Sequence, residues 1–325
     1  MVRSQSPAVV GNSASSRRGS GTVSRPAARR ALVTRARRAP LGGWLFVLPA
    51  LAAYAAFVLW PVVQTIRYSF YNWDGILPGR WVGLQNFQTV FTDPQLLGAL
   101  AHAGELILFF SFFPVMLGLL VASVIRRVAS RRISSAAQAV LFLPQIVPLV
   151  AAGIAWSWTL SSTGAVNQVL SGVGLRRLTR PWLGSFTTAL PAVGVIGAWV
   201  LLGLCTVLLL TGMSKIDGTL YEAAQLDGTG PVREFFAITL PLLRNEIAVC
   251  VTVTMIAALS AFDIVYISTN GGPGDTTMVP GLKVYQLAFF NREMGLASAL
   301  ALVLMVLVLI CVLPVQLLSR RTGQQ

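Results

Sequence analysis

The chain has 325 residues, of which 55% are hydrophobic and only 11% are charged, whereas soluble proteins carry about 25% charged residues. The composition excludes a soluble domain and predicts a polytopic membrane protein. The net charge of +14 is accompanied by no nucleic-acid-binding motif, so membrane topology explains this charge better than nucleic-acid binding does.

Residues 1–40 form a basic tail with nine arginines, no acidic residue and many Ser, Ala, Gly and Pro residues. Such a segment cannot bury a core, so we predict a disordered cytoplasmic tail. An anchor for membrane topology is favoured, and attraction to anionic lipid and a targeting signal are the alternatives. The 23-residue apolar run that follows is too long for the core of a cleaved signal peptide, which spans about 7 to 15 residues.

Six apolar stretches after the tail are long enough to cross about 30 Å of hydrocarbon as helices. They are residues 41–63, 106–125, 139–160, 189–213, 247–267 and 294–319. A helix satisfies its own backbone hydrogen bonds where no water is present, so each stretch predicts a spanning helix. The sequence thus predicts an all-α membrane domain over residues 41–325 with about six transmembrane helices.

The distribution of positive charge predicts the orientation, because cytoplasmic segments of membrane proteins are enriched in Lys and Arg. With the N-terminus inside, 18 of the 25 Lys and Arg residues are cytoplasmic. The loop that holds Arg176, Arg177 and Arg180 runs against this distribution. We predict a multi-pass protein with both its N-terminus and its C-terminus in the cytoplasm.

Two polar residues within the apolar stretches are candidates for lining a translocation path, because polar groups that face lipid are costly. Gln145 lies between Pro144 and Pro148, which free nearby carbonyls that a cavity or a neighbouring helix must satisfy. Asp263 is the only charged residue in the six stretches. Its alternative role is to cap a helix or to pair with an arginine.

Residues 214–244, between the fourth and fifth stretches, carry the strongest local signature. Thr219 and Glu222 have the spacing of a capping box, and Gly228 stands where a helix ends in a left-handed residue. Pro231 suits the first turn of a second short helix, and Pro241 the entry into the next stretch. We predict two short helices bent at a glycine that dock into a groove on a partner. An amphipathic loop on the membrane surface is the alternative.

The spacing of this segment, Glu222-Ala223-Ala224, three residues, Gly228, nine residues, then Ile238-x-Leu240-Pro241, resembles the EAA loop of permease subunits in binding-protein-dependent ABC importers. Other segments are similar to carbohydrate permeases of the maltose and glycerol-3-phosphate type. They are residues 82–87, 91–94, 143–148, 164–167, 262–266 and 269–274. The glycine turn in the last of these is typical of the first permease of a heterodimeric pair. The chain departs from the pattern at residues 101–104 and in its basic tail.

The resemblance implies a type I ABC importer permease of the bacterial inner (cytoplasmic) membrane, which forms half of the translocation path for a sugar or related solute. It implies as partners a second permease subunit, two cytoplasmic ABC ATPase subunits and an extracytoplasmic solute-binding protein. It also implies an ATPase-coupling loop made of Glu222, Ala223, Ala224, Asp227, Gly228, Ile238, Leu240 and Pro241.

A glycine-rich turn follows the fifth stretch. Gly271, Gly272, Pro273 and Gly274 cannot continue a helix, and the charge distribution places them outside. We predict an external turn that presents free backbone groups to the binding protein.

The sequence contains no P-loop, no zinc-protease motif and no nucleophile elbow. We therefore expect a transport subunit that binds no ATP, cofactor or metal and is not an enzyme. Its energy comes from a partner or from an ion gradient. A gradient-driven secondary transporter, with Asp263 as its one intramembrane acid, is the main alternative, and a membrane-bound enzyme is the third.

Overall fold

The computed structural model describes residues 41–128 and 130–322, so the predicted disordered tail, residues 1–40, lies outside the described residues. The chain divides into two units, residues 1–55 and 56–325. In the described part of the first unit, α1 (Leu41–Tyr54) is an apolar helix that contains Pro49.

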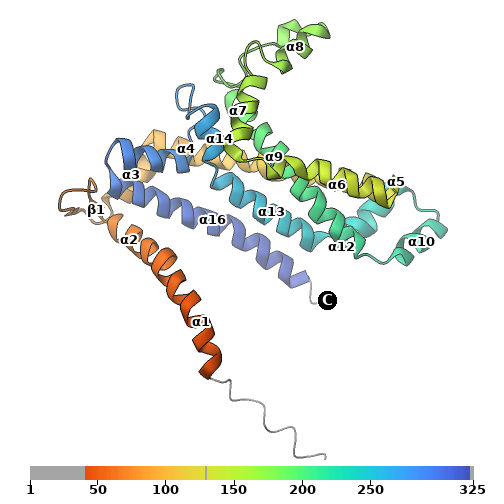
Figure 1. Cartoon of the computed structure of the whole chain (residues 1–325), viewed down its shortest axis with the longest axis horizontal. Helices are drawn as coiled ribbons and strands as arrows, with labels where there is room; N and C mark the ends of the chain where they lie inside the picture. The colour runs from red at the N-terminus through yellow and green to blue at the C-terminus, as the bar shows by residue number, and fades with distance from the viewer. Residues whose placement is uncertain (1–40, 129, 323–325) are drawn as a thin grey trace, which may run out of the picture. The chain divides into compact units, whose positions relative to one another are not determined.

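The described residues are almost entirely helical, as predicted for an all-α fold (Figure 1). After α1, the elements of the first half are η2 (Ala55–Leu59), α2 (Trp60–Tyr68), β1 (Tyr71–Asn72), β2 (Arg80–Trp81), α3 (Gln85–Thr92), α4 (Pro94–Ile107), η3 (Leu108–Phe112), α5 (Phe113–Val128), α6 (Arg131–Ile146) and α7 (Leu149–Thr159). Those of the second half are α8 (Ala165–Gly172), η4 (Arg176–Leu178), α9 (Ala189–Ser214), α10 (Gly218–Leu226), α11 (Pro231–Glu234), η5 (Phe235–Thr239), α12 (Leu240–Leu242), α13 (Arg244–Leu259), α14 (Asp263–Ser268), α15 (Pro280–Tyr285), η6 (Gln286–Phe290) and α16 (Met294–Thr322).

Four helices of the described chain are long and apolar enough to cross a membrane, and two bent pairs raise the number to six if each pair is one span. The four are Phe46–Tyr68, Pro94–Arg127, Ala189–Ser214 and Met294–Ser319. This agrees with the prediction of about six transmembrane helices.

The third and fifth predicted stretches are not single straight helices. The third divides into α6 and α7, which meet at 94° around Val147 and Pro148. Pro148 lacks an N–H donor and disfavours helical backbone at Val147, and the helix is interrupted here because both residues leave the helical region, with ψ of 128° at Val147 and 135° at Pro148. In the fifth, α13 ends at Leu259 and α14 starts at Asp263, and a further bend of 70° precedes α13 at Leu243.

The second unit is organised around α9, which contacts α5, α6 and α13 (Figure 1). In the most apolar 18-residue stretch of α9, 56% of the residues are buried. Glycines allow the close approach of its neighbours, since a Cβ at Gly197 would overlap the Phe110 ring and one at Gly203 would overlap the Leu141 carbonyl. Small residues at helix interfaces are a common way to pack helices where lipid provides no hydrophobic driving force.

Two of the three hydrophobic core clusters of the described residues follow the same helices. One contains Val193, Ile196 and Leu282, and the other contains Leu119, Leu209 and Leu243, all of them buried. Together the clusters hold α5, α9 and α13 against one another along their length, so these helices form the framework on which the sites below are built.

Candidate functional site

The first candidate site is the pair of helices from α10 to α12, residues 218–242, called here the two-helix segment. Asp217 caps the first helix, because its Oδ1 accepts a hydrogen bond from the Thr219 N–H at 3.0 Å. The predicted capping box is therefore wrong. Thr219 lies inside the helix rather than at its cap, and Glu222 is an exposed residue of the helix interior. An aspartate at the N-cap does the same work as the predicted threonine.

The first helix ends at Leu226, and Gly228 is the left-handed residue that follows, as predicted, with φ at +72°. The Gly228 N–H donates to the Gln225 carbonyl at 3.0 Å, and the Thr229 N–H donates to the Ala224 carbonyl at 3.0 Å. These two bonds form a Schellman motif, which requires a left-handed residue that glycine adopts without a Cβ penalty. The Thr229 hydroxyl adds a bond to the same Ala224 carbonyl at 2.6 Å. The bend between the two helices is thus fixed by hydrogen bonds.

The second helix begins at Pro231 as predicted, but it is longer than predicted. It runs as one helical piece from Pro231 to Leu242, with a π-helical turn over η5. Pro241 lies in its last turn, and the change of direction comes at Leu243, after the proline. The second helix is therefore an arm that leads directly into α13.

Tyr221, in the first helix of the segment, is buried. Its hydroxyl shares a hydrogen bond with Thr239 Oγ1 at 3.1 Å, which joins the two helices of the segment. The Arg126 guanidinium at the end of α5 lies over its ring, 3.7 Å from the ring centroid. Such a cation–π contact attaches the first helix to α5.

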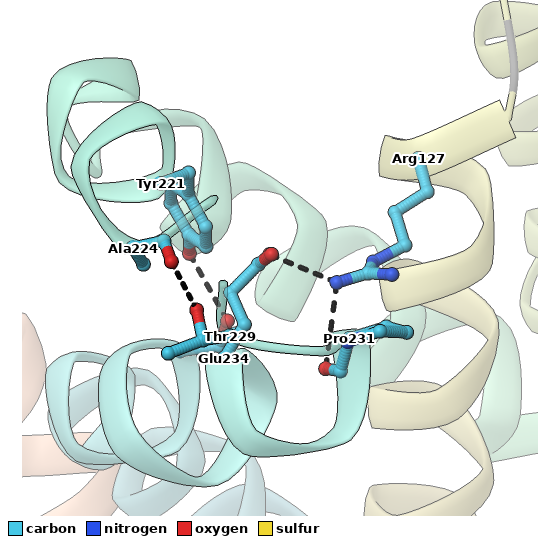
Figure 2. Close-up of polar contacts among 7 residues, drawn as sticks. Arg127, Tyr221, Ala224, Thr229, Pro231 and Glu234 are labelled. Atoms are coloured by element: carbon cyan, nitrogen blue, oxygen red, sulfur yellow. Dashed lines mark hydrogen bonds and ion pairs between the residues drawn. The ribbon is translucent and has the colours of Figure 1, made fainter. Parts of the chain in front are cut away.

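The next residue of α5 attaches the second helix. Arg127 pairs with Glu234, with 2.9 Å between Nη2 and Oε1, and it also donates to the Pro231 carbonyl at 3.4 Å (Figure 2). Glu234 is only 8% exposed, so the cost of burying its carboxylate charge is offset by the guanidinium of Arg127. A cleft of about 730 Å³ lies beside these contacts and is lined by both arginines, Tyr221 and Glu234. Two consecutive arginines thus hold both arms of the two-helix segment.

The predicted coupling residues differ in exposure. Glu222, Ala223, Asp227, Gly228 and Pro241 are exposed, and Ala224, Ile238 and Leu240 are partly buried. Leu226 and Phe236 are also exposed, at 89% and 61%. The segment therefore presents a carboxylate face with apolar side chains beside it, and its buried side is attached to α5.

The second candidate site is a cavity of about 510 Å³, called here the Gln145 cavity. It is lined by residues around the α6–α7 break, by Gly197, Val200 and Leu201 of α9, and by residues 257 and 260–264. Gln145 and Asp263, predicted separately from sequence, both line it. The Oε1 atom of Gln145 is buried and has no hydrogen-bond partner among the described residues. Asp263 begins α14 with an exposed side chain.

Sequence reasoning missed several residues of both sites. Arg126, Arg127 and Glu234 read in the sequence as ordinary charges of a cytoplasmic surface, and no local pattern pairs them. The α9 residues that line the cavity are small or apolar, so they do not stand out in an apolar span. The proline pair around Gln145 was the one signal of an irregular helix.

The predicted external turn is ordered by its own hydrogen bonds. Thr277 donates through its N–H to the Gly271 carbonyl at 3.1 Å and through its hydroxyl to the Gly272 carbonyl at 2.9 Å. The expectation of free backbone groups is therefore wrong for these two carbonyls. Gly271 is buried, and Gly274 is exposed beside Phe186, so the surface of the turn is formed by Pro273, Gly274 and Asp275.

Comparisons with known proteins bear on both sites. The family model described as binding-protein-dependent transport system inner membrane component matches residues 114–324, which include the whole two-helix segment and nearly all residues of the Gln145 cavity. The chain is 33% identical over 284 residues to the probable ABC transporter permease protein YurN of Bacillus subtilis, covering 87% of this chain and 97% of that protein.

Two further matched proteins have names that include a sugar. The diacetylchitobiose uptake system permease protein NgcF of Streptomyces coelicolor is 34% identical over 286 residues, covering 84% of this chain and 80% of that protein. The solved structure of a bacterial alginate ABC transporter, in complex with a periplasmic protein bound to an alginate pentasaccharide, has a chain that matches with a TM-score of 0.72 at 25% identity. That match covers 86% of this chain and 93% of the other.

Proposed function

Because the chain belongs to the family of binding-protein-dependent transport system inner membrane components, we propose that it is the permease subunit of an ATP-driven importer for a sugar or sugar-like solute. The chain is a membrane transport subunit and not an enzyme. The proposal of a sugar is supported by the diacetylchitobiose and alginate transporters to which the chain is similar.

One geometric observation carries the proposed mechanism. The two-helix segment is joined directly in sequence to α9 on one side and to α13 on the other, and both helices line the Gln145 cavity. From Leu201, at the cavity, to Ser214, at the end of α9, the helix extends about 20 Å. The third helix of the framework, α5, is attached to the segment by Arg126 and Arg127. A displacement of the segment therefore reaches the cavity through three packed helices.

The energy source in this proposal is a pair of cytoplasmic ABC ATPase subunits, since the chain has no nucleotide-binding motif. Glu222, Asp227 and the exposed apolar residues of the two-helix segment form the surface that enters a groove on an ATPase subunit. ATP binds the closed ATPase dimer better than the open one, and this difference in affinity drives the change of conformation. A second permease subunit completes the path, and Gln145 and Asp263 line this chain's half of it.

We place both termini and the two-helix segment in the cytoplasm, and the turn at 271–274 outside, where Pro273 and Gly274 contact a solute-binding protein. This orientation is supported by the distribution of Lys and Arg. Cysteines at Asp275 and Thr219 test it in a background without Cys205, Cys250 and Cys311. An impermeant thiol reagent added outside should label the first and not the second, and loaded binding protein should protect the first. The reverse labelling would contradict the orientation, and labelling without protection would contradict the contact.

The proposed function is tested by purifying the tagged chain with its bound partners and reconstituting the complex in proteoliposomes. A solute-binding protein loaded from a panel of sugars, including diacetylchitobiose and alginate oligosaccharides, should stimulate both ATP hydrolysis and uptake. Uptake that requires an ion gradient and no ATP would instead support the secondary transporter. Stimulation by glycerol phosphate and by no sugar would retain the importer and change its substrate.

A further inference from the structure

A cluster of aromatic side chains surrounds a further, smaller hollow between α14 and η6, called here the aromatic groove. Its volume is about 320 Å³ and it is lined by Tyr266, Asn270, Tyr285, Gln286, Phe290 and Asn291. The groove is therefore three aromatic rings and three carboxamides, with no charged side chain among its lining residues.

The rings contact one another in a continuous series. Tyr285 lies at its centre, with ring centroids 5.7 Å from Tyr266 and 5.5 Å from Phe290. The neighbouring Tyr266 phenol raises the pKa of Tyr285 above its ordinary value, chiefly because charge on the two phenols would repel. Tyr266 remains 39% exposed and Phe290 69% exposed, so their faces are available to a ligand.

Phe262 connects this groove to the Gln145 cavity. Its ring is stacked on Tyr266 with centroids 5.3 Å apart and an interplanar angle of 10°, and it is also a lining residue of the cavity. A solute moving between the groove and the cavity would therefore pass from ring to ring. A belt of aromatic residues facing lipid does not require such continuity with a polar cavity.

The chemistry of the groove fits a sugar ring. One face of a pyranose carries mainly C–H groups, which pack against the negative face of an aromatic ring. The hydroxyls at its edge both donate and accept hydrogen bonds, as do the carboxamides of Asn270, Gln286 and Asn291. The volume is at the lower end of the range for ligand pockets, which suits about one ring rather than a whole oligosaccharide.

We propose that the aromatic groove is a sugar-binding subsite through which the solute passes on its way to the Gln145 cavity, a proposal that rests on the proposed function and its orientation. The subsite holds the trailing ring of a longer oligosaccharide after the rings ahead of it have entered the cavity. A chain of several rings gains contacts at both places, whereas a disaccharide already seated in the cavity leaves the groove empty.

The test compares Tyr266→Ala and Phe290→Ala with Tyr266→Phe, which keeps the ring, and with Phe91→Ala, an exposed aromatic on α3 that is not a lining residue of the groove. Uptake by the whole complex in proteoliposomes is measured against the concentration of diacetylchitobiose, alginate pentasaccharide and further oligosaccharides of two to five rings. The two alanine variants should raise the half-saturating concentration of longer sugars about fivefold, as expected for one lost stacking contact. Disaccharide uptake and ATPase activity without solute should stay unchanged, as should both control variants.

The outcomes separate the two proposals. Equal effects of Tyr266→Ala on short and long sugars, or effects equal to those of Phe91→Ala, would contradict the subsite and leave the importer intact. If the wild-type complex takes up no sugar of the panel but another solute with ATP, the proposed substrate class fails and the sugar subsite fails with it.

Discussion

The two-helix segment and the Gln145 cavity differ in whether their buried polar groups have partners. In the segment, the buried Glu234 is paired with Arg127, and the hydroxyl of Tyr221 is bonded to Thr239. In the cavity, the buried Oε1 of Gln145 has no partner among the described residues. A buried oxygen without a hydrogen bond costs about 1–3 kcal/mol. The segment and the end of α5 thus pair these buried polar groups with each other, as we expect of a rigid lever, whereas in our proposal a solute completes the cavity.

The largest effect should come from breaking the lever at its bend. In Gly228→Pro, proline fixes φ near −65° where the chain needs +72°, and it removes the bond to the Gln225 carbonyl. We expect the ATPase subunits to be lost on purification and uptake to fall by about 100-fold or more, since such a change costs about 3 kcal/mol or more. The measurements are co-purification and uptake.

Gly230→Ala is the matched control for this change. Gly230 has a negative φ of −74° and open space where an alanine Cβ would lie, so alanine should be accepted with normal uptake. Normal co-purification and uptake in Gly228→Pro would show that the bend does not transmit force.

The next effect concerns the attachment of the lever to α5. Arg127→Ala leaves the Glu234 carboxylate buried without its partner, at a cost of about 1–3 kcal/mol. We expect uptake to fall about tenfold while ATP hydrolysis continues, because the segment moves without α5. Arg127→Met combined with Glu234→Leu should recover stability and part of the uptake.

Arg132→Ala, at an exposed position of α6, is the control for loss of one positive charge on this side of the protein. Uptake in Arg127→Ala equal to that in Arg132→Ala would mean that the ion pair has no role in coupling. Thermal unfolding of each variant separates a loss of fold from a loss of coupling.

A smaller effect should follow at Glu222, which is exposed and caps nothing. Glu222→Gln and Glu222→Ala should lower coupled uptake alike, by about threefold to fivefold, because each removes one charge from the partner surface. Asp217→Ala, which removes the actual cap, should cost about 1 kcal/mol of stability. Normal uptake in Glu222→Gln with loss in Glu222→Ala would exclude an ion pair with the ATPase.

The smallest effect is expected in the cavity, and it should have opposite signs for stability and function. Gln145→Leu removes the unpaired oxygen, so the midpoint of thermal unfolding should rise or stay unchanged. The half-saturating solute concentration should rise about twofold to threefold, since one hydrogen bond to the solute is lost. Ser260→Ala, at another lining position, is the control. A fall in stability with unchanged solute affinity would assign Gln145 to the fold and not to the path.

The sequence predicts best the features that depend on neighbours along the chain. The glycine stop at 228, the proline start at 231 and four of the six spans follow from local rules of helix ends and hydropathy. The capping box was wrong because two acceptable caps, Asp217 and Thr219, lie two residues apart and the pattern does not rank them.

Features that depend on packing between distant segments were not predictable in the same way. The Arg127–Glu234 pair joins α5 to α11, and its members look like any surface charges in the sequence. Hydropathy also averages over the α6–α7 break, because the residues on both sides are equally apolar. Gln145 and Asp263 were each found as polar groups in apolar surroundings, but their common cavity depends on that break and on the glycine face of α9.

The break between α6 and α7 has a consequence for biosynthesis. With 16 and 11 residues, the two helices extend about 24 Å and about 17 Å, and each is shorter than the roughly 30 Å of a bilayer core. Neither is long enough to span the core alone, and α6 packs closely against α9, where Gly203 lies beside the carbonyl of Leu141. Because α9 leaves the ribosome later, we expect this pair of helices to take its final position in the bundle only after α9 has been made.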